Sequence, residues 1–99
     1  MQFQNKTAIS TGAASGMGLL LAQCWAHEGG NVLMCDINEA VLMEKAAEIN
    51  AKGVGRAVGM LCDVRDYAQV CAARDRAVAA FGSIDLMCNF AGGTAVRML

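Results

Sequence analysis

The sequence has no proline and a single histidine, His27, among its 99 residues. No proline-rich linker and no low-complexity tract divides it, and a chain of this length has room for one small domain, so we expect one unit over residues 1–99. Eight basic and nine acidic residues give a net charge of -1. Without a basic stripe to neutralise phosphates, nucleic acid is not expected as a partner.

Signals for membranes and metals are also missing. The segment from Met1 to Lys6 is polar, so no signal peptide is indicated, and no apolar run reaches the length of a membrane span. We therefore expect a cytoplasmic protein with no membrane partner. The five cysteines form no Cys-x-x-Cys pair and have no nearby histidine that would complete a metal site, so none is expected. Cys35, Cys62 and Cys88 lie in apolar runs and are predicted to be buried, reduced thiols.

What the sequence does have is a hydrophobic fraction of 56%, enough to collapse around a core. Apolar runs of strand length alternate with segments whose apolar residues recur at helical spacing. Strands are predicted at Thr7–Thr11, Asn31–Cys35, Arg56–Cys62 and Ile84–Cys88. The apolar faces of the helices between them are predicted to consist of Met17, Leu20, Leu21, Cys24 and Trp25, then Leu42, Ala46 and Ile49, then Val70, Ala73, Ala77, Val78 and Phe81.

Glycine follows each predicted helix, at Gly29, Gly53 and Gly82, as expected for C-terminal caps. Strands of this kind joined by amphipathic helices indicate a parallel sheet covered on both faces. Right-handed crossovers then predict the fold class α/β, a partial Rossmann fold with a doubly wound parallel sheet. The predicted order is β-α-β-α-β-α-β, ending after the fourth strand.

A glycine-rich turn, Thr11 to Gly18, lies between the first predicted strand and helix. Gly12 and Gly16 can adopt unusual dihedral angles and let the backbone approach a pyrophosphate, while Gly18 lets the helix lie close to the strand. The N–H groups at the start of the helix favour an anion because of the helix dipole. The strand before the turn and the helix after it favour dinucleotide binding over a turn that serves packing alone.

Asp36 closes the second predicted strand, roughly 20 residues after the turn, which is the offset expected for a carboxylate that binds an adenosine ribose. The alternative is that Asp36 only caps the following helix, a role that Asn38 fills equally well. The two roles are compatible, and we favour the ribose-binding role.

Two further strand ends carry candidate residues. Asp63 can accept a hydrogen bond from an adenine amino group, and Val64 can cover the ring. The alternative for Asp63 is a turn or capping role, with Asp66 as the competing N-cap. After the fourth strand, the small residues of Asn89–Gly93 would let the backbone lie against a ribose, although glycine in such a loop also serves turn geometry alone.

In order and spacing these motifs resemble the classical short-chain dehydrogenase/reductase family, as does the stretch Phe81 to Leu86. The resemblance spans essentially the whole chain and about the first two-fifths of a typical member. It implies an oxidoreductase that moves a hydride between NAD and an alcohol or carbonyl carbon. It also implies cofactor-binding residues: Gly12, Ser15, Gly16, Met17 and Gly18 at the pyrophosphate, Asp36 at the adenosine ribose, Asp63 and Val64 at adenine, and Asn89, Phe90, Ala91 and Gly92 after the fourth strand.

The sequence departs from the family in two places. The family usually has Asn-Asn-Ala-Gly where this chain has Phe90 after Asn89, so a backbone contact can remain there but a side-chain hydrogen bond is lost. Family catalysis uses a Ser, a Tyr-x-x-x-Lys pair and an Asn, whereas Tyr67 has Cys71 at the lysine position and no lysine follows Lys52. We therefore expect a cofactor-binding segment with no catalytic residue of its own.

For the complete enzyme, the resemblance implies NAD(H), a small alcohol or ketone substrate and a homo-oligomer. The carboxylate of Asp36 predicts a preference for NAD over NADP, because it would repel a 2′-phosphate. The lone His27 is expected to interact with the end of its own helix rather than with a substrate.

Two other readings remain open. An S-adenosylmethionine-dependent methyltransferase also has a glycine-rich first turn and an acidic residue at the end of the second strand, although its glycine spacing differs. A non-catalytic nucleotide-sensing module would keep the Rossmann site without the chemistry.

Overall fold

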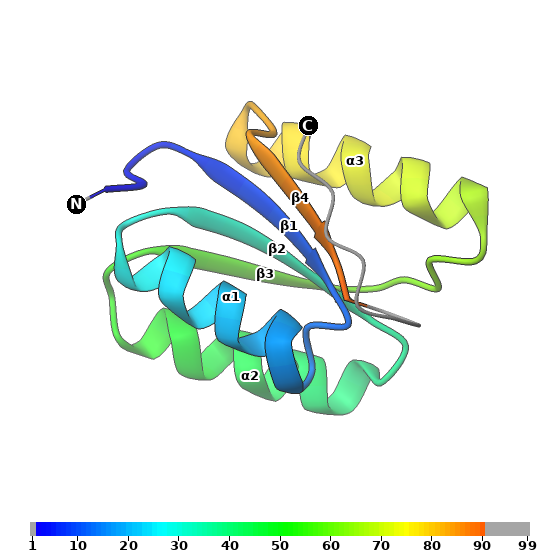
Figure 1. Ribbon diagram of the computed structural model, residues 1–99, viewed down its shortest axis with the longest axis horizontal. Coiled ribbons are helices and arrows are strands. Elements are labelled where there is room, and N and C mark those ends of the chain that lie inside the picture. The colour runs from blue at the N-terminus through cyan, green and yellow to red at the C-terminus, as the bar shows by residue number, and fades with distance from the viewer. Residues whose placement is uncertain (1, 91–99) are drawn as a thin grey trace.

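Four parallel strands form one sheet in the order β3-β2-β1-β4 in the computed structural model, which describes residues 2–90. Helices α1 and α2 cover one face of the sheet and α3 covers the other (Figure 1). The predicted doubly wound α/β fold is therefore confirmed. The elements are β1 (Thr7–Thr11), α1 (Gly16–His27), β2 (Asn31–Asp36), α2 (Glu39–Ala51), β3 (Arg56–Leu61), α3 (Tyr67–Phe81) and β4 (Leu86–Asn89).

Strand β1 has β2 on one side and β4 on the other. Thr11 is in register with Cys35 of β2 and with Asn89 of β4, while Asp36 is in register with Leu61 of β3. The carboxyl ends of all four strands therefore reach the same edge of the sheet. Because the strand order reverses between β1 and β4, this edge contains the topological switch point where open α/β sheets bind ligands.

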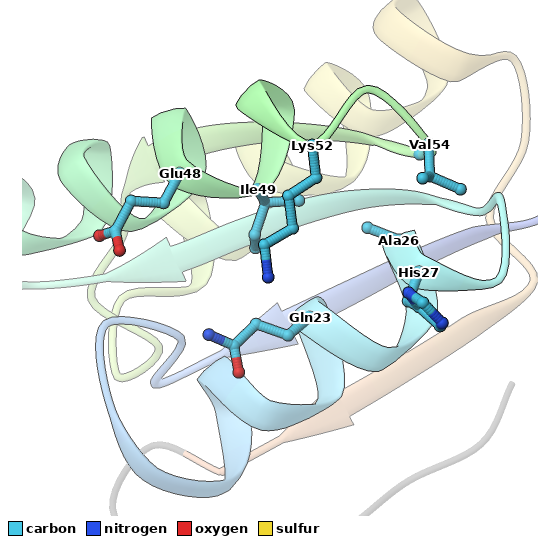
Figure 2. Close-up of a pocket in the computed structure, with 8 residues that line it drawn as sticks. Gln23, Ala26, His27, Glu48, Ile49, Lys52 and Val54 are labelled. Atoms are coloured by element: carbon cyan, nitrogen blue, oxygen red, sulfur yellow. The ribbon is translucent and has the colours of Figure 1, made fainter.

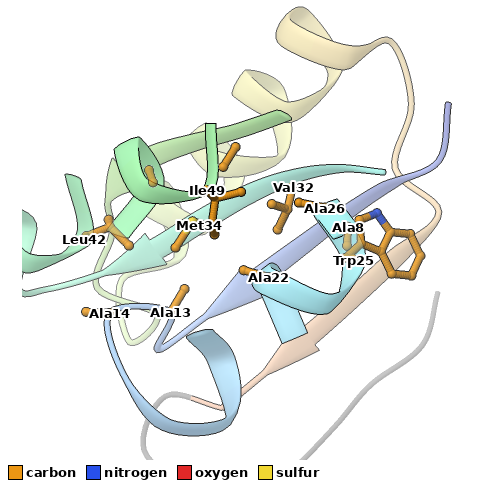
Figure 3. Close-up of a cluster of buried hydrophobic side chains, with 12 residues drawn as sticks. Ala8, Ala13, Ala14, Ala22, Trp25, Ala26, Val32, Met34, Leu42 and Ile49 are labelled. Carbon is orange, nitrogen blue, oxygen red and sulfur yellow. The ribbon is translucent and has the colours of Figure 1, made fainter. Parts of the chain in front are cut away.

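Two layers of buried side chains hold the helices on the sheet. On the α1 and α2 face, the strands contribute Ala8, Val32 and Met34, which belong to one cluster with the helix residues (Figure 3). Several helix residues in this cluster are alanines, and small side chains let a helix lie close to a sheet. The layer beneath α3 is built from Ile9, Leu33, Cys35, Cys62, Ala73 and Ala77.

Asp85 determines where β4 begins. The sequence predicted a start at Ile84, but the strand starts at Leu86. The Asp85 carboxylate accepts the Thr7 N–H at 2.8 Å, and the Asp85 N–H donates to the Thr7 carbonyl at 2.8 Å. The Asp85 carboxylate thus takes the place of a backbone carbonyl in the hydrogen bonding between the two chain segments. Three other strand ends differ from the prediction by one residue each, because β2 reaches Asp36, β3 stops at Leu61 and β4 reaches Asn89.

The predicted apolar face of α1 is confirmed at Trp25, which is buried, but is wrong at three of its other residues. Met17 and Leu20 are 62% and 50% exposed, and Cys24 is also exposed. Apart from Trp25, the helix packs through small residues, because these allow close approach to the sheet. The buried Ser10 hydroxyl donates to the Gly18 carbonyl at 2.9 Å and fixes this side of the helix against β1. The buried residues of α1 are Gly18, Ala22, Trp25 and Ala26.

All five cysteines are free thiols. Cys35, Cys62 and Cys88 are buried, as the sequence predicted, and burial raises the pKa of Cys35 to about 12. Among residues 2–90, no three His, Cys, Asp or Glu side chains are grouped so that they could hold a metal ion. Within the same residues, no helix is both long and apolar enough to cross a membrane.

The thiols provide a test of the α1 orientation. We expect a polar thiol reagent at pH 8 to modify exposed Cys24 in the native protein, while Cys35 reacts only after unfolding, because Cys35 is buried and little of it is thiolate. Mass spectrometry of peptides after timed labelling measures both rates. Protection of Cys24 in the native protein, to the level of Cys35, would contradict the orientation of α1, and denatured protein serves as the control.

Candidate cofactor site

The three glycines of the turn, Gly12, Gly16 and Gly18, have different structural roles. Gly12 and Gly16 have φ angles of 63° and 60°, the left-handed region that glycine favours. A Cβ on Gly18 would overlap the Gly12 carbonyl oxygen and lie 2.7 Å from that of Thr11, whereas a Cβ on Gly16 would meet nothing within 4 Å. Gly18 therefore lets α1 begin directly against the end of β1, as the sequence predicted.

The start of α1 is open to an anion. Ser15 is the N-cap, with extended backbone and no capping hydrogen bond from its side chain. The N–H of Leu19 donates to the Ser15 carbonyl at 3.3 Å, so the N–H groups of Gly16, Met17 and Gly18 precede the helical bonding pattern. The first turn of α1, all of it described, contains no acidic side chain. N–H groups at the positive end of a helix dipole suit a pyrophosphate.

Asp36 is held at the end of β2 by two backbone N–H groups. Its Oδ2 accepts from Ala14 of the glycine turn at 3.0 Å, and its Oδ1 accepts from Asn38 at 3.0 Å. The cap of α2 is Asn38, whose side chain accepts from the Val41 N–H at 3.4 Å. Asp36 therefore does not cap α2, and its carboxylate is positioned beside the glycine turn.

Asp36 shares a cavity of about 280 Å³ with residues from the two neighbouring loops. The cavity brings together four of the residues that the sequence predicted. It also includes Ile37 and Arg65, which the prediction missed although each directly follows a predicted residue. The lining consists of Gly12, Asp36, Ile37, Cys62, Asp63, Val64 and Arg65.

Asp63 carries a two-point ion pair with Arg65. Arg65 Nε donates to Oδ1 at 3.0 Å and Nη2 donates to Oδ2 at 2.9 Å, while the Arg65 backbone N–H also donates to Oδ1 at 3.0 Å. The hydrogen bonds from Arg65 lower the pKa of the Asp63 carboxyl to about 2. The cap of α3 is Asp66, which accepts from the Ala68 N–H at 3.0 Å. Asp63 therefore has a turn role beside any ligand role, but it does not cap α3.

Thr11 connects the ends of β1 and β4. Its Oγ1 donates to Asn89 Oδ1 at 2.6 Å and accepts from the Phe90 N–H at 3.1 Å. These bonds hold the start of the Asn89–Gly93 segment at the switch point between the two strands. Because Thr11 engages the Phe90 N–H, a cofactor contact there would have to share or replace this bond. Ala91 and Gly92 lie outside the described residues.

The lone histidine lies far from this edge. His27 is the last residue of α1, as expected, and lines a small cavity of about 90 Å³ between α1 and α2. Gln23 of α1 and Lys52, the C-cap of α2, face the same space (Figure 2). Both helices end at the amino edge of the sheet, opposite the glycine turn. Tyr67, at the start of α3, is 81% exposed.

A model of the short chain dehydrogenase family matches residues 6–99. The chain belongs to this family. The diacetyl reductase of Staphylococcus epidermidis is 42% identical over 93% of this chain and 35% of its own length. The D-threitol dehydrogenase of Mycolicibacterium smegmatis is 39% identical over 92% of this chain and 35% of its own length.

A solved short-chain dehydrogenase/reductase from Burkholderia phymatum, in complex with NAD, has a similar fold. Its TM-score is 0.83 at 34% identity, with 88% of this chain and 31% of that chain covered. The chain therefore spans about a third of the length of these three relatives. The family resemblance read from the sequence motifs is confirmed.

The close contact between α1 and β1 at the glycine turn predicts that substitutions at Gly18 and Gly16 differ in their effect on stability. We expect Gly18→Ala to lower the free energy of unfolding by about 1–3 kcal/mol, because its methyl group must displace backbone carbonyls. Gly16→Asn is the matched control, since asparagine tolerates the left-handed region and Gly16 has open space around it. Urea denaturation measures both; a Gly18→Ala protein of wild-type stability would contradict the packing.

The ion pair predicts an unusual titration of Asp63. We expect its carboxyl to titrate near pH 2 and Arg65→Gln to move this midpoint toward the ordinary value of about 4. Because the folded-state pKa is lowered, the interaction favours the folded state above about pH 4 and is lost as the pH falls toward 2. The ¹³C shift of the carboxyl, measured by NMR, reports the midpoint, and an unchanged midpoint in Arg65→Gln would show that the pair does not form in solution.

Proposed function

We propose that the gene product is an NAD-dependent oxidoreductase of the short-chain dehydrogenase type, and that this chain is its cofactor-binding segment. The reaction moves a hydride between NAD and the carbon of an alcohol or carbonyl group. The observation that supports this most directly is the position of Asp36. Its carboxylate stands at the end of β2, is not the cap of α2, and shares a cavity with Gly12 and Asp63.

The residues present fit a dinucleotide in three parts. The open start of α1, with the glycine turn before it, suits a pyrophosphate because it offers backbone N–H groups without a competing carboxylate. The second lone pairs of the Asp36 oxygens can accept from the two hydroxyls of the adenosine ribose. The cavity between the β2 and β3 ends, with Asp63 and Val64, suits adenine.

Each of these residues binds or orients the cofactor. NAD, when bound, supplies the hydride acceptor, and the protein supplies orientation and the proton path. At the switch point, Thr11 holds Asn89 and the Phe90 backbone beside the end of β1, where the middle of the cofactor would pass. The NAD complex of the Burkholderia phymatum protein supports NAD as the cofactor here.

A small alcohol or ketone is the proposed substrate class of the complete gene product. Two relatives, named as a diacetyl reductase and a D-threitol dehydrogenase, support this class. We propose a homo-oligomer on the family resemblance. The five free thiols support a reducing compartment such as the cytoplasm.

Family membership leaves the methyltransferase reading without support. A non-catalytic sensor would bind the same cofactor, so activity is the measurement that separates it from an enzyme. The complete gene product is incubated with NAD and a panel of small alcohols, and with NADH and the matching ketones. A change in absorbance at 340 nm is expected. Tight NAD binding without turnover on either panel would favour the sensor.

Asp36 predicts the choice between NAD and NADP. We expect the wild-type protein to bind NAD more tightly than NADP, and Asp36→Ala to weaken NAD binding by about 1.5–3 kcal/mol through loss of charge-assisted hydrogen bonds. The same variant should bind NADP better than the wild type does, because the repulsion of the 2′-phosphate is removed. Calorimetric titration of the complete gene product with both cofactors measures the two effects.

Two variants control this experiment. Asp36→Asn keeps the shape of the side chain and one acceptor oxygen. It should therefore lose less affinity for NAD than Asp36→Ala does, and gain as much affinity for NADP. Asp75→Asn changes an exposed carboxylate on α3 that pairs with Arg74 and should change neither affinity. Equal binding of NAD and NADP by the wild type, or an unchanged preference in Asp36→Ala, would show that Asp36 does not contact the ribose.

A further inference from the structure

Arg65 is a cation to which the proposed pyrophosphate, ribose and adenine positions assign no role. It follows β3, lines the cavity shared by Asp36 and Asp63, and is anchored to the Asp63 carboxylate through two of its three side-chain nitrogens, Nε and Nη2. Its side chain is 85% exposed. Exposed ion pairs contribute little to stability, so fold stability alone does not account for this geometry.

The anchoring leaves Asp63 able to bind a ligand. An ionised carboxylate has about four acceptor positions. Arg65 fills two on Oδ1, through its backbone N–H and Nε, and one on Oδ2. One position on Oδ2 remains for a single N–H donor such as an exocyclic amino group. Arg65 therefore need not leave when such a group binds.

The anchoring also fixes the guanidinium as a plane. A two-point contact with a carboxylate sets both the position and the tilt of the arginine head group. Two other residues that line the cavity are aliphatic: Val64 on the same loop and Ile37, which follows β2. Ile37 is 67% exposed, so its side chain is accessible to a ligand in this cavity. A cavity with a fixed flat cation and exposed aliphatic side chains suits a flat aromatic base.

We propose that Arg65, fixed in place by Asp63, forms one wall of the adenine site and stacks on the base of the dinucleotide. The inference rests on the proposed function, because it assumes that adenine occupies this cavity. Nucleobases stack on guanidinium planes as they do on aromatic rings, and this contact depends on shape as well as charge. Arg65 is thus a determinant of affinity for the adenine half of the cofactor. It is not a ligand of a phosphate.

Three substitutions separate stacking from charge. Arg65→Gln removes both the plane and the charge, Arg65→Lys keeps the charge alone, and Arg65→Phe keeps a flat surface alone. We expect the dissociation constant for NAD to rise about fivefold in Arg65→Gln and Arg65→Lys, and to return close to wild type in Arg65→Phe. The loss in Arg65→Gln should be the same for NADP as for NAD, since both contain adenine.

Arg74→Gln is the matched control. Arg74 is also an exposed arginine paired with a neighbouring aspartate, Asp75, but it does not line this cavity. We expect its affinity for NAD to equal that of the wild type. Calorimetric titration of the complete gene product gives all dissociation constants, and thermal denaturation checks that each variant is folded.

Other outcomes would overturn the proposal that Arg65 stacks on adenine. Restored binding in Arg65→Lys but not in Arg65→Phe, or a larger loss for NADP than for NAD, would overturn stacking in favour of a contact with phosphate. Unchanged or tighter NAD binding in Arg65→Gln would overturn the inference while leaving the proposed function in place. A wild-type protein that binds neither NAD nor NADP would overturn the proposed function and the inference with it.

Discussion

The close contact between the start of α1 and the end of β1 constrains every other part of the site. A side chain at Gly18 would collide with the carbonyls of Thr11 and Gly12, so only glycine lets the helix begin there. The Ser10 hydroxyl, which donates to the Gly18 carbonyl, holds the helix in this position. A helix displaced outward by one methyl group would carry its N–H groups away from the strand edge where an anion would lie.

The same turn positions the neighbouring carboxylate. Ala14, two residues beyond Gly12, donates its N–H to Asp36 at 3.0 Å, so the conformation of the β1 loop sets the orientation of a side chain on β2. On the other side of β1, Thr11 binds both Asn89 and the Phe90 backbone. One loop thus positions groups on both flanking strands, and the parallel register brings all of them to one edge.

The fold was predictable because each strand and helix carries its own local signal, and the glycines mark their boundaries. The face of α1 was predictable only at Trp25, because apolar periodicity favours large residues such as Met17 and Leu20, whereas close packing requires small residues such as Gly18. In the site, Asp36 and Asp63 were found as acidic residues at strand ends. Arg65 was missed because its importance depends on an ion pair that only the folded loop creates.

The two carboxylates of the cavity differ in how they are satisfied, and this difference matches two kinds of ligand group. Asp36 is held by neutral backbone N–H groups, so its negative charge remains; it can accept from hydroxyls and repels a phosphate. Asp63 is held by a guanidinium, so the pair is close to neutral overall. A neutral base with one amino donor suits the second environment, because it needs an acceptor and a flat surface more than a charge. The local partner of each carboxylate, rather than the carboxylate itself, therefore sets the kind of group that it can accept.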